Sequence, residues 1–305
     1  MSVKKKLIII GGPTASGKTD CAIQLAQHFG TEILSADSRQ FYKEMSIGTA
    51  KPQLSDLAKA KHHFIGNLSI HDAYSVGDFE RDALAVLETI FETHDTAIMV
   101  GGTGLYIRAV CEGLDEFPDV PLSIRDEFEA IFKNQGIEPL QKLLQEVDYE
   151  YFIQVDIHNP IRLIRALSVW KASGQPFSSF RSGNKVERNF TPIYIALDLP
   201  REVLYDRINR RVDLMMAEGL LEEAKSLHPF KDLNALQTVG YTELFAHFDG
   251  EMTLDEAVDK IKQHTRNYAK RQMTWFRKND FWQRVDPQEF TSSNYLSNII
   301  NQIIS

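Results

Sequence analysis

Cysteine is scarce in this chain. Its 305 residues include two cysteines, Cys21 and Cys111, which are too few for a disulfide framework and lack zinc-finger spacing. A reducing cytoplasm is the simplest interpretation of that usage. Long apolar runs are also missing, because no segment approaches the roughly 20 apolar residues of a membrane span. The short apolar run after the N-terminal lysines leads into a glycine-rich turn, so we do not interpret it as a signal peptide. We therefore predict a cytoplasmic protein without a membrane partner.

Positive charge is in deficit over the whole chain. The formal net charge is −8, which argues mildly against a nucleic-acid partner. The charge is uneven, however, since residues 258–285 hold eight Lys or Arg and two Asp. Aromatic residues are interleaved with these charges: Tyr268, Trp275, Phe276, Phe281 and Trp282. Two interpretations stay open, a solvated basic helix or a basic aromatic surface for RNA.

The best-defined motif follows the first apolar run. Residues 7–10 are apolar, and GPTASGKT at 12–19 fits the phosphate-loop pattern G-x-x-x-x-G-K-[ST]. In such a loop the backbone N–H groups face phosphates, the lysine adds charge, and the last hydroxyl binds Mg²⁺. The predicted phosphate-binding residues are Gly12, Pro13, Thr14, Ala15, Ser16, Gly17, Lys18 and Thr19, with Thr19 as the metal ligand. The alternative is a glycine-rich turn with an incidental lysine, but the helical pattern at 18–29 favours a phosphate site.

Strand and helix patterns alternate over the first 110 residues and then stop. The candidate parallel strands lie at 7–10, 32–35, 97–100 and 193–199, and helices lie between them at 18–29 and 78–93. Residues 113–190 contain proline and glycine among short helical patterns at 122–133, 138–146 and 160–173, without a strong strand. A last polar helix is expected near 293–304.

This organisation predicts an α/β fold with a P-loop NTPase-like parallel sheet. The sheet core, with a helical C-terminal region, would comprise residues 1–112 and 191–305. Residues 113–190 would form an all-helical insertion domain.

Many phosphate-loop motors have an acidic residue at the end of a later apolar strand, where it holds Mg²⁺ and positions water. The best candidate strand of this chain lacks that residue. The strand at 97–100 ends in Gly-Gly-Thr, which favours a kinase or transferase over an NTP-hydrolysing motor. Asp37, just beyond the second strand, could supply the carboxylate. A loop aspartate is more often a turn residue, but a position at the C-terminal edge of a parallel strand next to the phosphate loop favours the catalytic role. Arg207 and Arg211 share a helix face and could neutralise phosphate charge or remain solvated.

Several separated motifs together resemble the bacterial tRNA dimethylallyltransferases, also called tRNA isopentenyltransferases. They follow the family's order from about residue 7 to 280. After the phosphate loop they are SADSRQFYKEMSIGTAKP at 35–52, HH at 62–63, YSVGDF at 74–79, VGGTGLYIRA at 100–109, NPIRLIRAL at 159–167, LPREVLYDRINRRVDLM at 199–215 and TVGYTEL at 238–244. The zinc finger of eukaryotic members is absent, since no cysteine follows Cys111.

The resemblance implies a reaction. This family transfers a dimethylallyl group from dimethylallyl diphosphate to N6 of the adenine 3′-adjacent to the anticodon, in tRNAs that read codons starting with U. The phosphate loop would then hold the diphosphate leaving group with Mg²⁺. Asp37 would accept the N6 proton, and Thr103, Lys18 and Arg211 would complete the catalytic set, with Arg207 on the donor phosphates.

The same resemblance implies how the anticodon stem-loop of tRNA is held. The implied tRNA-binding residues are Asp37, Ser38, Arg39, Gln40, Thr103, Arg125, Ile161, Arg162, Leu163, Ile164, Arg165, Val239, Gly240 and Tyr241. The adenine would leave the loop stack to reach the donor. We expect a monomer.

Two other functions would share parts of this pattern. A small-molecule or nucleoside kinase using ATP would share the phosphate loop and the arginine-bearing helix, but does not need the helical insertion or the basic C-terminal third. An RNA-binding module with a relic phosphate loop is disfavoured because Lys18, Thr19 and Asp37 are intact.

Overall fold

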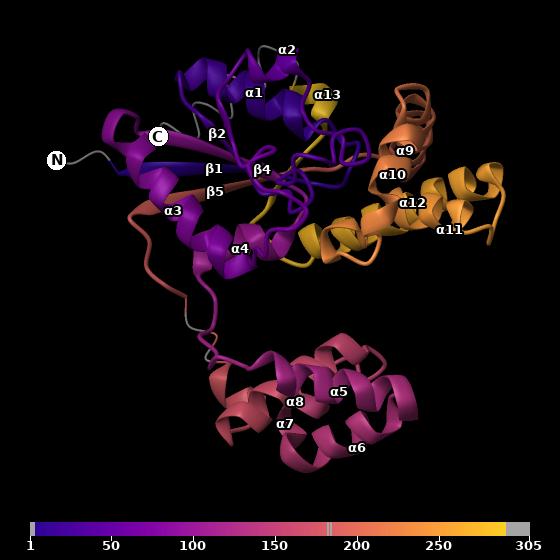
Figure 1. The fold of residues 1–305 in the computed structure, drawn as a ribbon. Helices are drawn as coiled ribbons and strands as arrows, with labels where there is room; N and C mark the ends of the chain where they lie inside the picture. The colour runs from indigo at the N-terminus through magenta and orange to yellow at the C-terminus, as the bar shows by residue number, and fades with distance from the viewer. Residues whose placement is uncertain (1–3, 182, 184, 291–305) are drawn as a thin grey trace. The chain divides into compact units, whose positions relative to one another are not determined.

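The structure is a computed structural model that describes residues 4–181, 183 and 185–290 (Figure 1). It divides into two compact units. One unit is built from residues up to Glu112 and from Glu187 onward, and the other is Gly113–Val186. In the described part of the chain, no helix is both long and apolar enough to cross a membrane. The helix expected near 293–304 lies outside the described residues.

The first unit contains a six-stranded sheet in the order β3-β2-β4-β1-β5-β6, and every neighbouring pair is parallel. Its strands are β1 (Lys5–Gly11), β2 (Ile33–Ser35), β3 (His62–His63), β4 (Thr96–Gly101), β5 (Phe190–Leu197) and β6 (Gln283–Val285). The central strand β1 is apolar because both of its faces are covered, and residues 7–10 are all fully buried. The predicted α/β class with a parallel sheet is confirmed.

Helices cover both faces of this sheet. Ile8 and Ile10 pack with α1 (Lys18–Phe29) on one face. Leu7 and Ile9 belong to the core on the other face, under α3 (Val76–Thr93) and α4 (Gly104–Glu112). Figure 1 shows α1 and α4 on opposite sides of the strands. The alternation follows from the two-residue period of a strand. A short helix, α2 (Leu54–Leu57), lies in the connection between β2 and β3.

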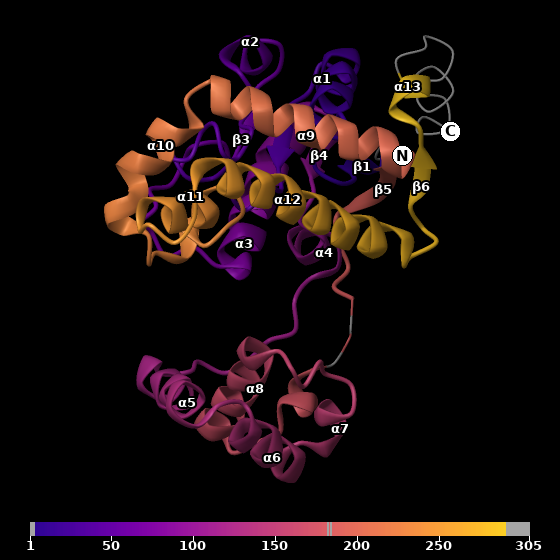
Figure 2. The ribbon, with the colours of Figure 1, turned by 90° about the vertical axis from the view of Figure 1, so that its right-hand side faces the viewer.

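The C-terminal part of this unit is largely helical, as expected. Its helices are α9 (Arg201–Ala217), α10 (Leu220–Leu227), α11 (Tyr241–Phe248), α12 (Leu254–Arg277) and α13 (Pro287–Phe290), with short 3₁₀ turns at His228–Phe230 and Asn234–Leu236. Figure 2 shows α12 running alongside α9, which it contacts.

Of the two interpretations of the basic segment, an aromatic surface for RNA does not apply to two of its rings. Phe276 and Trp282 are each 3% exposed and belong to the core of the sheet. Trp275 packs partly buried against the same core. Tyr268 and Phe281 keep an exposed portion. Apolar packing beside the charged residues therefore explains most of the aromatic content of this segment.

Within the described residues of the second unit, the regular elements are all helices. It contains α5 (Leu122–Gln135), α6 (Glu138–Val147), α7 (Tyr149–Phe152), α8 (Pro160–Ser173) and a 3₁₀ turn at Phe177–Phe180. These elements share a core that includes Phe128, Leu144 and Leu167. The side chain of Asn159 caps α8 by accepting the Arg162 N–H at 3.3 Å, and a proline follows at the first helical position.

Candidate active site at the phosphate loop

The loop between β1 and α1 has the backbone geometry that its glycines predict. Gly12 and Gly17 have φ values of 145° and 94°, in the range that L side chains rarely adopt. A Cβ at Gly12 would lie 3.0 Å from the Leu197 carbonyl oxygen. Helix α1 then starts at Lys18, so the unpaired N–H groups and positive dipole end of α1 lie at the loop.

A cavity of about 630 Å³ lies at this loop. Residues 14–20 line it, and Asp37, Arg211 and Tyr268 line it from other elements. Cationic and anionic groups thus face the same space from α1, the end of β2 and α9. The structure brings the predicted phosphate residues Thr14 to Thr19 together with the predicted catalytic Asp37 and Arg211.

Lys18 is one of the cations that line this cavity. Its Nζ donates to the Pro13 carbonyl at 2.6 Å. Burial lowers the pKa of Lys18 to about 8, Asp37 opposes that shift, and Arg211 adds to it. A desolvated lysine beside an arginine is a receptor for an anion, because an anionic ligand would restore the charge balance.

Ser16 gives an independent sign of a polar ligand. Its side-chain oxygen is buried and has no hydrogen-bond partner among the described residues. Buried hydroxyls are rarely left unpaired in native structures. A phosphate oxygen in the adjoining cavity would satisfy it, so the donor set of Ser16, Lys18 and the α1 N-terminus suits a phosphate group.

Asp37 follows β2 and lines the 630 Å³ cavity together with a second cavity of about 420 Å³. Its Oδ1 accepts the Arg39 N–H at 3.1 Å. Burial raises the pKa of Asp37, while that hydrogen bond and the Lys18 charge partly oppose the rise. A carboxylate with a raised pKa is a stronger proton acceptor than an exposed one.

The second cavity is more apolar than the first. Ile208, Val212 and Ile261 line part of it, and Arg211 and Tyr268 line both cavities. Burial lowers the pKa of Arg211, Asp20 opposes that shift, and Arg207 adds to it. Arg207 itself lines neither cavity.

Thr103 lies just beyond β4 and next to Tyr268 of α12. Burial and the Asp37 charge raise the pKa of Tyr268 to about 12, and a hydrogen bond with Thr103 partly opposes that. Thr103, Tyr268 and Asp37 therefore form one polar group beside the phosphate loop.

Comparison with known proteins agrees with this geometry. The sequence profile of the family described as IPP transferase matches residues 40–279. The chain belongs to this family.

Curated relatives support the same assignment. The tRNA dimethylallyltransferase of Christiangramia forsetii is 54% identical, over 97% of this chain and 98% of its own length. That of Flavobacterium johnsoniae is 52% identical, over 90% and 91%.

Solved structures are similar as well. The tRNA isopentenylpyrophosphate transferase of Bacillus halodurans has a TM-score of 0.71 at 36% identity, covering 99% of this chain and 96% of that one. A eukaryotic dimethylallyltransferase described as acting on tRNA has a TM-score of 0.80 at 26% identity, covering 98% of this chain and 79% of that one.

In this IPP transferase, two residues after Asp37 form side-chain hydrogen bonds with the backbone of other segments. Arg39 donates from its guanidinium to the carbonyls of Asn234 and Ala235, both at 2.9 Å. The amide of Gln40 donates to the carbonyls of Thr49 and Ala50 at 3.2 and 3.1 Å. Ser38, Arg39, Val239 and Gly240 line the 420 Å³ cavity.

Tyr241 and part of the α8 segment are interior residues. Tyr241 is fully buried, and its hydroxyl donates to Glu223 at 2.7 Å. Leu163 and Ile164 belong to the core of the helical unit, whereas Ile161 is 73% exposed.

The predicted arginines of the helical unit differ in their surroundings. Arg125 pairs with Glu129 at 2.7 Å, and Arg165 lies over the Phe117 ring at 5.2 Å. Arg162 follows the cap of α8.

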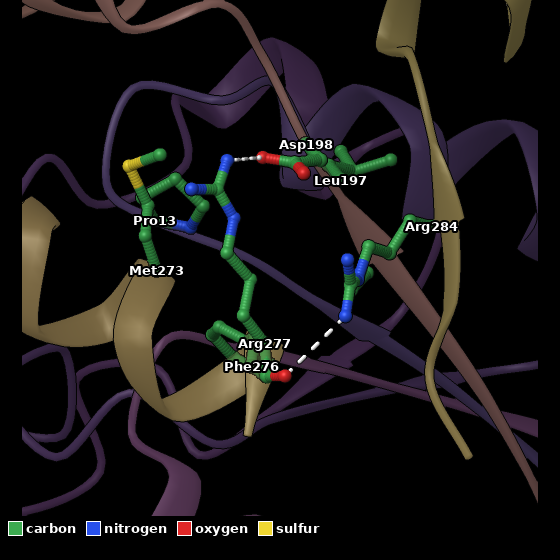
Figure 3. A pocket seen from close by; sticks show the side chains of 8 residues that line it. Pro13, Leu197, Asp198, Met273, Phe276, Arg277 and Arg284 are labelled. Carbon is green, nitrogen blue, oxygen red and sulfur yellow. Dashed lines mark hydrogen bonds and ion pairs between the residues drawn. The ribbon is translucent and has the colours of Figure 1, made fainter. Parts of the chain in front are cut away.

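Asp198 directly follows β5 and is a strand-end carboxylate that the sequence patterns did not indicate. It does not line the phosphate-loop cavity; it pairs with Arg277 at 2.8 Å beside a small pocket of about 10 Å³ (Figure 3). Within the described residues, no group of three or more His, Cys, Asp or Glu is arranged to hold a metal ion. The Thr19 hydroxyl lines the cavity, as do the Ser16 hydroxyl and the carboxylates of Asp20 and Asp37. Mg²⁺ prefers such oxygen ligands, together with phosphate and water.

Sequence reasoning also missed Gln272 and Glu223. The Gln272 amide contacts the phosphate loop, and the Glu223 carboxylate holds the loop that follows Met45. Their partners lie 258 and 176 positions away in the chain, so no local pattern could reveal these contacts.

Proposed function

We propose that this IPP transferase is a tRNA dimethylallyltransferase. It transfers the dimethylallyl group of dimethylallyl diphosphate to N6 of the adenine 3′-adjacent to the anticodon, in tRNAs that read codons starting with U. The observation that carries this proposal is Asp37, a buried carboxylate that lines both the phosphate-loop cavity and the neighbouring, more apolar cavity. The near full-length similarity to chains named tRNA dimethylallyltransferase disfavours a small-molecule kinase.

The donor's diphosphate occupies the phosphate loop. Lys18, the Ser16 hydroxyl and the N–H groups at the start of α1 bind its oxygens, and Arg211 faces it from α9. Negative charge grows on the diphosphate as the carbon–oxygen bond breaks, so these groups stabilise the transition state more than the ground state. Thr19 would hold Mg²⁺, which neutralises part of that charge when bound.

The acceptor approaches from the side of Asp37. The adenine N6 is a weak nucleophile, because its lone pair is delocalised into the ring. As the bond between N6 and the allylic carbon forms, the carbon–oxygen bond breaks, diphosphate leaves, and the N6 proton passes to Asp37. The raised pKa of Asp37 favours this transfer. Thr103 lies beside Tyr268 and orients the acceptor next to Asp37.

The remaining predicted contacts belong to the tRNA anticodon stem-loop. In the helical unit, Arg162 and Arg165 contact the RNA backbone, with Arg125 and the exposed Ile161 nearby in the same unit. Ser38, Arg39 and residues 239–240 shape the pocket that receives the flipped adenine, and Gln40 lines the neighbouring phosphate-loop cavity. The enzyme acts as a monomer in the cytoplasm.

The test is transfer of labelled dimethylallyl from dimethylallyl diphosphate to unmodified tRNA with adenine 3′-adjacent to the anticodon. We expect transfer by the wild type and a loss of about 100-fold or more in kcat for Asp37→Asn, with tRNA affinity retained. Asp206→Asn, an exposed aspartate on α9, is the matched control. ATP-dependent phosphorylation of a small acceptor, without dimethylallyl transfer, would support the kinase instead.

A further inference from the structure

Gln272 of α12 has an amide that spans two loops of the site. Its side chain is almost fully buried, with 7% of the residue exposed. Its Oε1 accepts the N–H of Thr14 in the phosphate loop at 2.9 Å. Its Nε2 donates to the carbonyl of Gly102, in the turn after β4, at 3.0 Å. Both polar ends of one buried side chain are therefore satisfied by loops from different strands.

Glycines let α12 approach the sheet edge this closely. A Cβ at Gly102 would lie 2.1 Å from Nε2 of Gln272, and one at Gly104 would lie 2.2 Å from the Trp275 ring. Neither distance is compatible with a real side chain. The turn after β4 thus leaves space for the Gln272 amide at one position and for the Trp275 ring at another.

The end of α12 is anchored just beyond Gln272. The Arg277 guanidinium pairs with Asp198 at 2.8 Å, and Arg284 donates to the Arg277 carbonyl at 3.3 Å. Figure 3 shows both contacts beside Pro13, close to the phosphate loop. These contacts fix the end of α12 to the residue after β5 and to β6. The Gln272 amide is therefore carried by a rigid element.

We propose that Gln272 is a positioning residue for dimethylallyl transfer, an inference that rests on the proposed function. Gln272 keeps Thr14 and Gly102 in a fixed relation, and Thr103 directly follows Gly102. The first loop carries the leaving group and the second carries a residue of the acceptor side. The amide therefore aligns donor with acceptor, and losing it reduces the fraction of complexes with reacting atoms in line.

The first experiment measures kcat and KM for a variant without the polar amide. Gln272→Met keeps the length of the side chain and should lower kcat by about tenfold or more, with both KM values within about threefold. Gln272→Glu keeps an acceptor for Thr14 but, when ionised, leaves the Gly102 carbonyl without a donor and adds negative charge to the lining of the phosphate-loop cavity. Its kcat should therefore fall at least as far as that of Gln272→Met. Gln263→Met, at an exposed position of the same helix, should match the wild type.

A second pair of variants tests the contact from the other side. Gly102→Ala places a methyl group against the Gln272 amide and should also lower kcat. Combining it with Gln272→Ala should be no worse than Gln272→Ala alone, because the clashing group is gone. Thermal unfolding and circular dichroism of each variant show whether it is folded.

The outcomes separate two failures. A wild type without dimethylallyl transfer overturns the proposed function and this inference with it. An active wild type whose Gln272→Met variant has wild-type kcat, or a Gly102→Ala effect that adds fully to Gln272→Ala, overturns only the positioning role. A loss of kcat in Gln272→Met and Gln272→Glu, together with effects of Gly102→Ala and Gln272→Ala that do not add, supports the positioning role.

Discussion

Lys18 holds a charge that the folded protein desolvates. Its pKa falls from 10.5 to about 8, so the unfolded chain binds this proton more tightly than the native state does. The free energy of unfolding should therefore rise with pH between about 8 and 10.5 through this group. Below pH 8 the full penalty is present, which means that Lys18 costs stability at neutral pH until an anion binds.

Replacing Lys18 by an apolar side chain should consequently stabilise the ligand-free enzyme. We expect Lys18→Met to raise the free energy of unfolding at pH 7 by about 1 kcal/mol, a value discounted for partial exposure. The gain should shrink as pH rises toward 10.5. Urea denaturation across this pH range measures it, with Lys133→Met at an exposed site as the control.

The same variant should lose its response to diphosphate. Inorganic diphosphate with Mg²⁺ stabilises the native state only to the extent that it binds. The wild type should show a shift in melting temperature that Lys18→Met largely lacks. A variant less stable than the wild type, yet still stabilised by diphosphate, would contradict this account of Lys18.

At the scale of elements, apolar patterning predicted the buried strands and failed for the edge strands. Strands β1, β4 and β5 contain apolar runs because helices or loops cover them. Strand β3 is two half-buried histidines, and β6 has exposed Gln283 and Arg284. These short strands join the sheet through backbone pairing, which leaves no side-chain period to recognise.

The residues of the candidate site also fall into those that a local sequence pattern identifies and those that it does not. The phosphate loop and Asp37 could be found because their chemistry is local to a strand end. For the other predicted residues, burial in the folded protein determines whether they can contact a ligand. Tyr241 matched a tRNA-contact position but is interior, because α10 and α11 pack around it. Sequence alone does not distinguish an aromatic residue of a core from one of a surface.

Helix α10 fixes a loop of the site through one carboxylate. Glu223 accepts hydrogen bonds from the N–H groups of Ser46, Ile47 and Gly48 at 2.9 to 3.1 Å, and from the hydroxyl of Tyr241. Thr49 and Ala50, which line both cavities, follow directly. Burial and the Glu223 charge raise the pKa of Tyr241, so its hydroxyl stays a proton donor at every physiological pH.

Tyr241→Phe therefore tests a structural role against RNA contact. Losing one hydrogen bond should lower the free energy of unfolding by about 1 kcal/mol, measured by urea denaturation. Affinity for an anticodon stem-loop should stay within about twofold of the wild type. Thr242→Val, beside it on α11, loses a hydroxyl that contacts the Thr238 carbonyl and Glu243 and controls for general loosening of the helix. A large drop in RNA affinity with unchanged stability would place Tyr241 at the RNA instead.

On the scale of the whole molecule, charge is distributed unfavourably for an RNA-binding enzyme. Residues 113–186 carry eight Lys or Arg against eleven Asp or Glu, so the helical unit is acidic overall. Any affinity of this unit for RNA must come from local clusters and not from its net charge. Of the three predicted arginines, Arg125 pairs with Glu129 and Arg165 lies over the Phe117 ring. Arg162, in the first turn of α8, is therefore the best candidate for a contact with RNA.

Arg162→Ala should weaken binding of the anticodon stem-loop through loss of a phosphate contact. The plot of log K against log salt concentration should become shallower by about 0.7, the value for one contact to a single strand. Fluorescence anisotropy from 50 to 200 mM salt measures the slope. Lys142→Ala removes the same charge from an exposed site of the same unit and should leave the slope unchanged.

The diphosphate response gives the decisive contrast for Arg162. The helical unit has its own core, and no residue of the phosphate-loop cavity belongs to it. Diphosphate should therefore raise the melting temperature of Arg162→Ala as much as that of the wild type, while RNA affinity falls. If both responses fall together, Arg162 acts on folding, and the contact with RNA must be sought elsewhere on the unit.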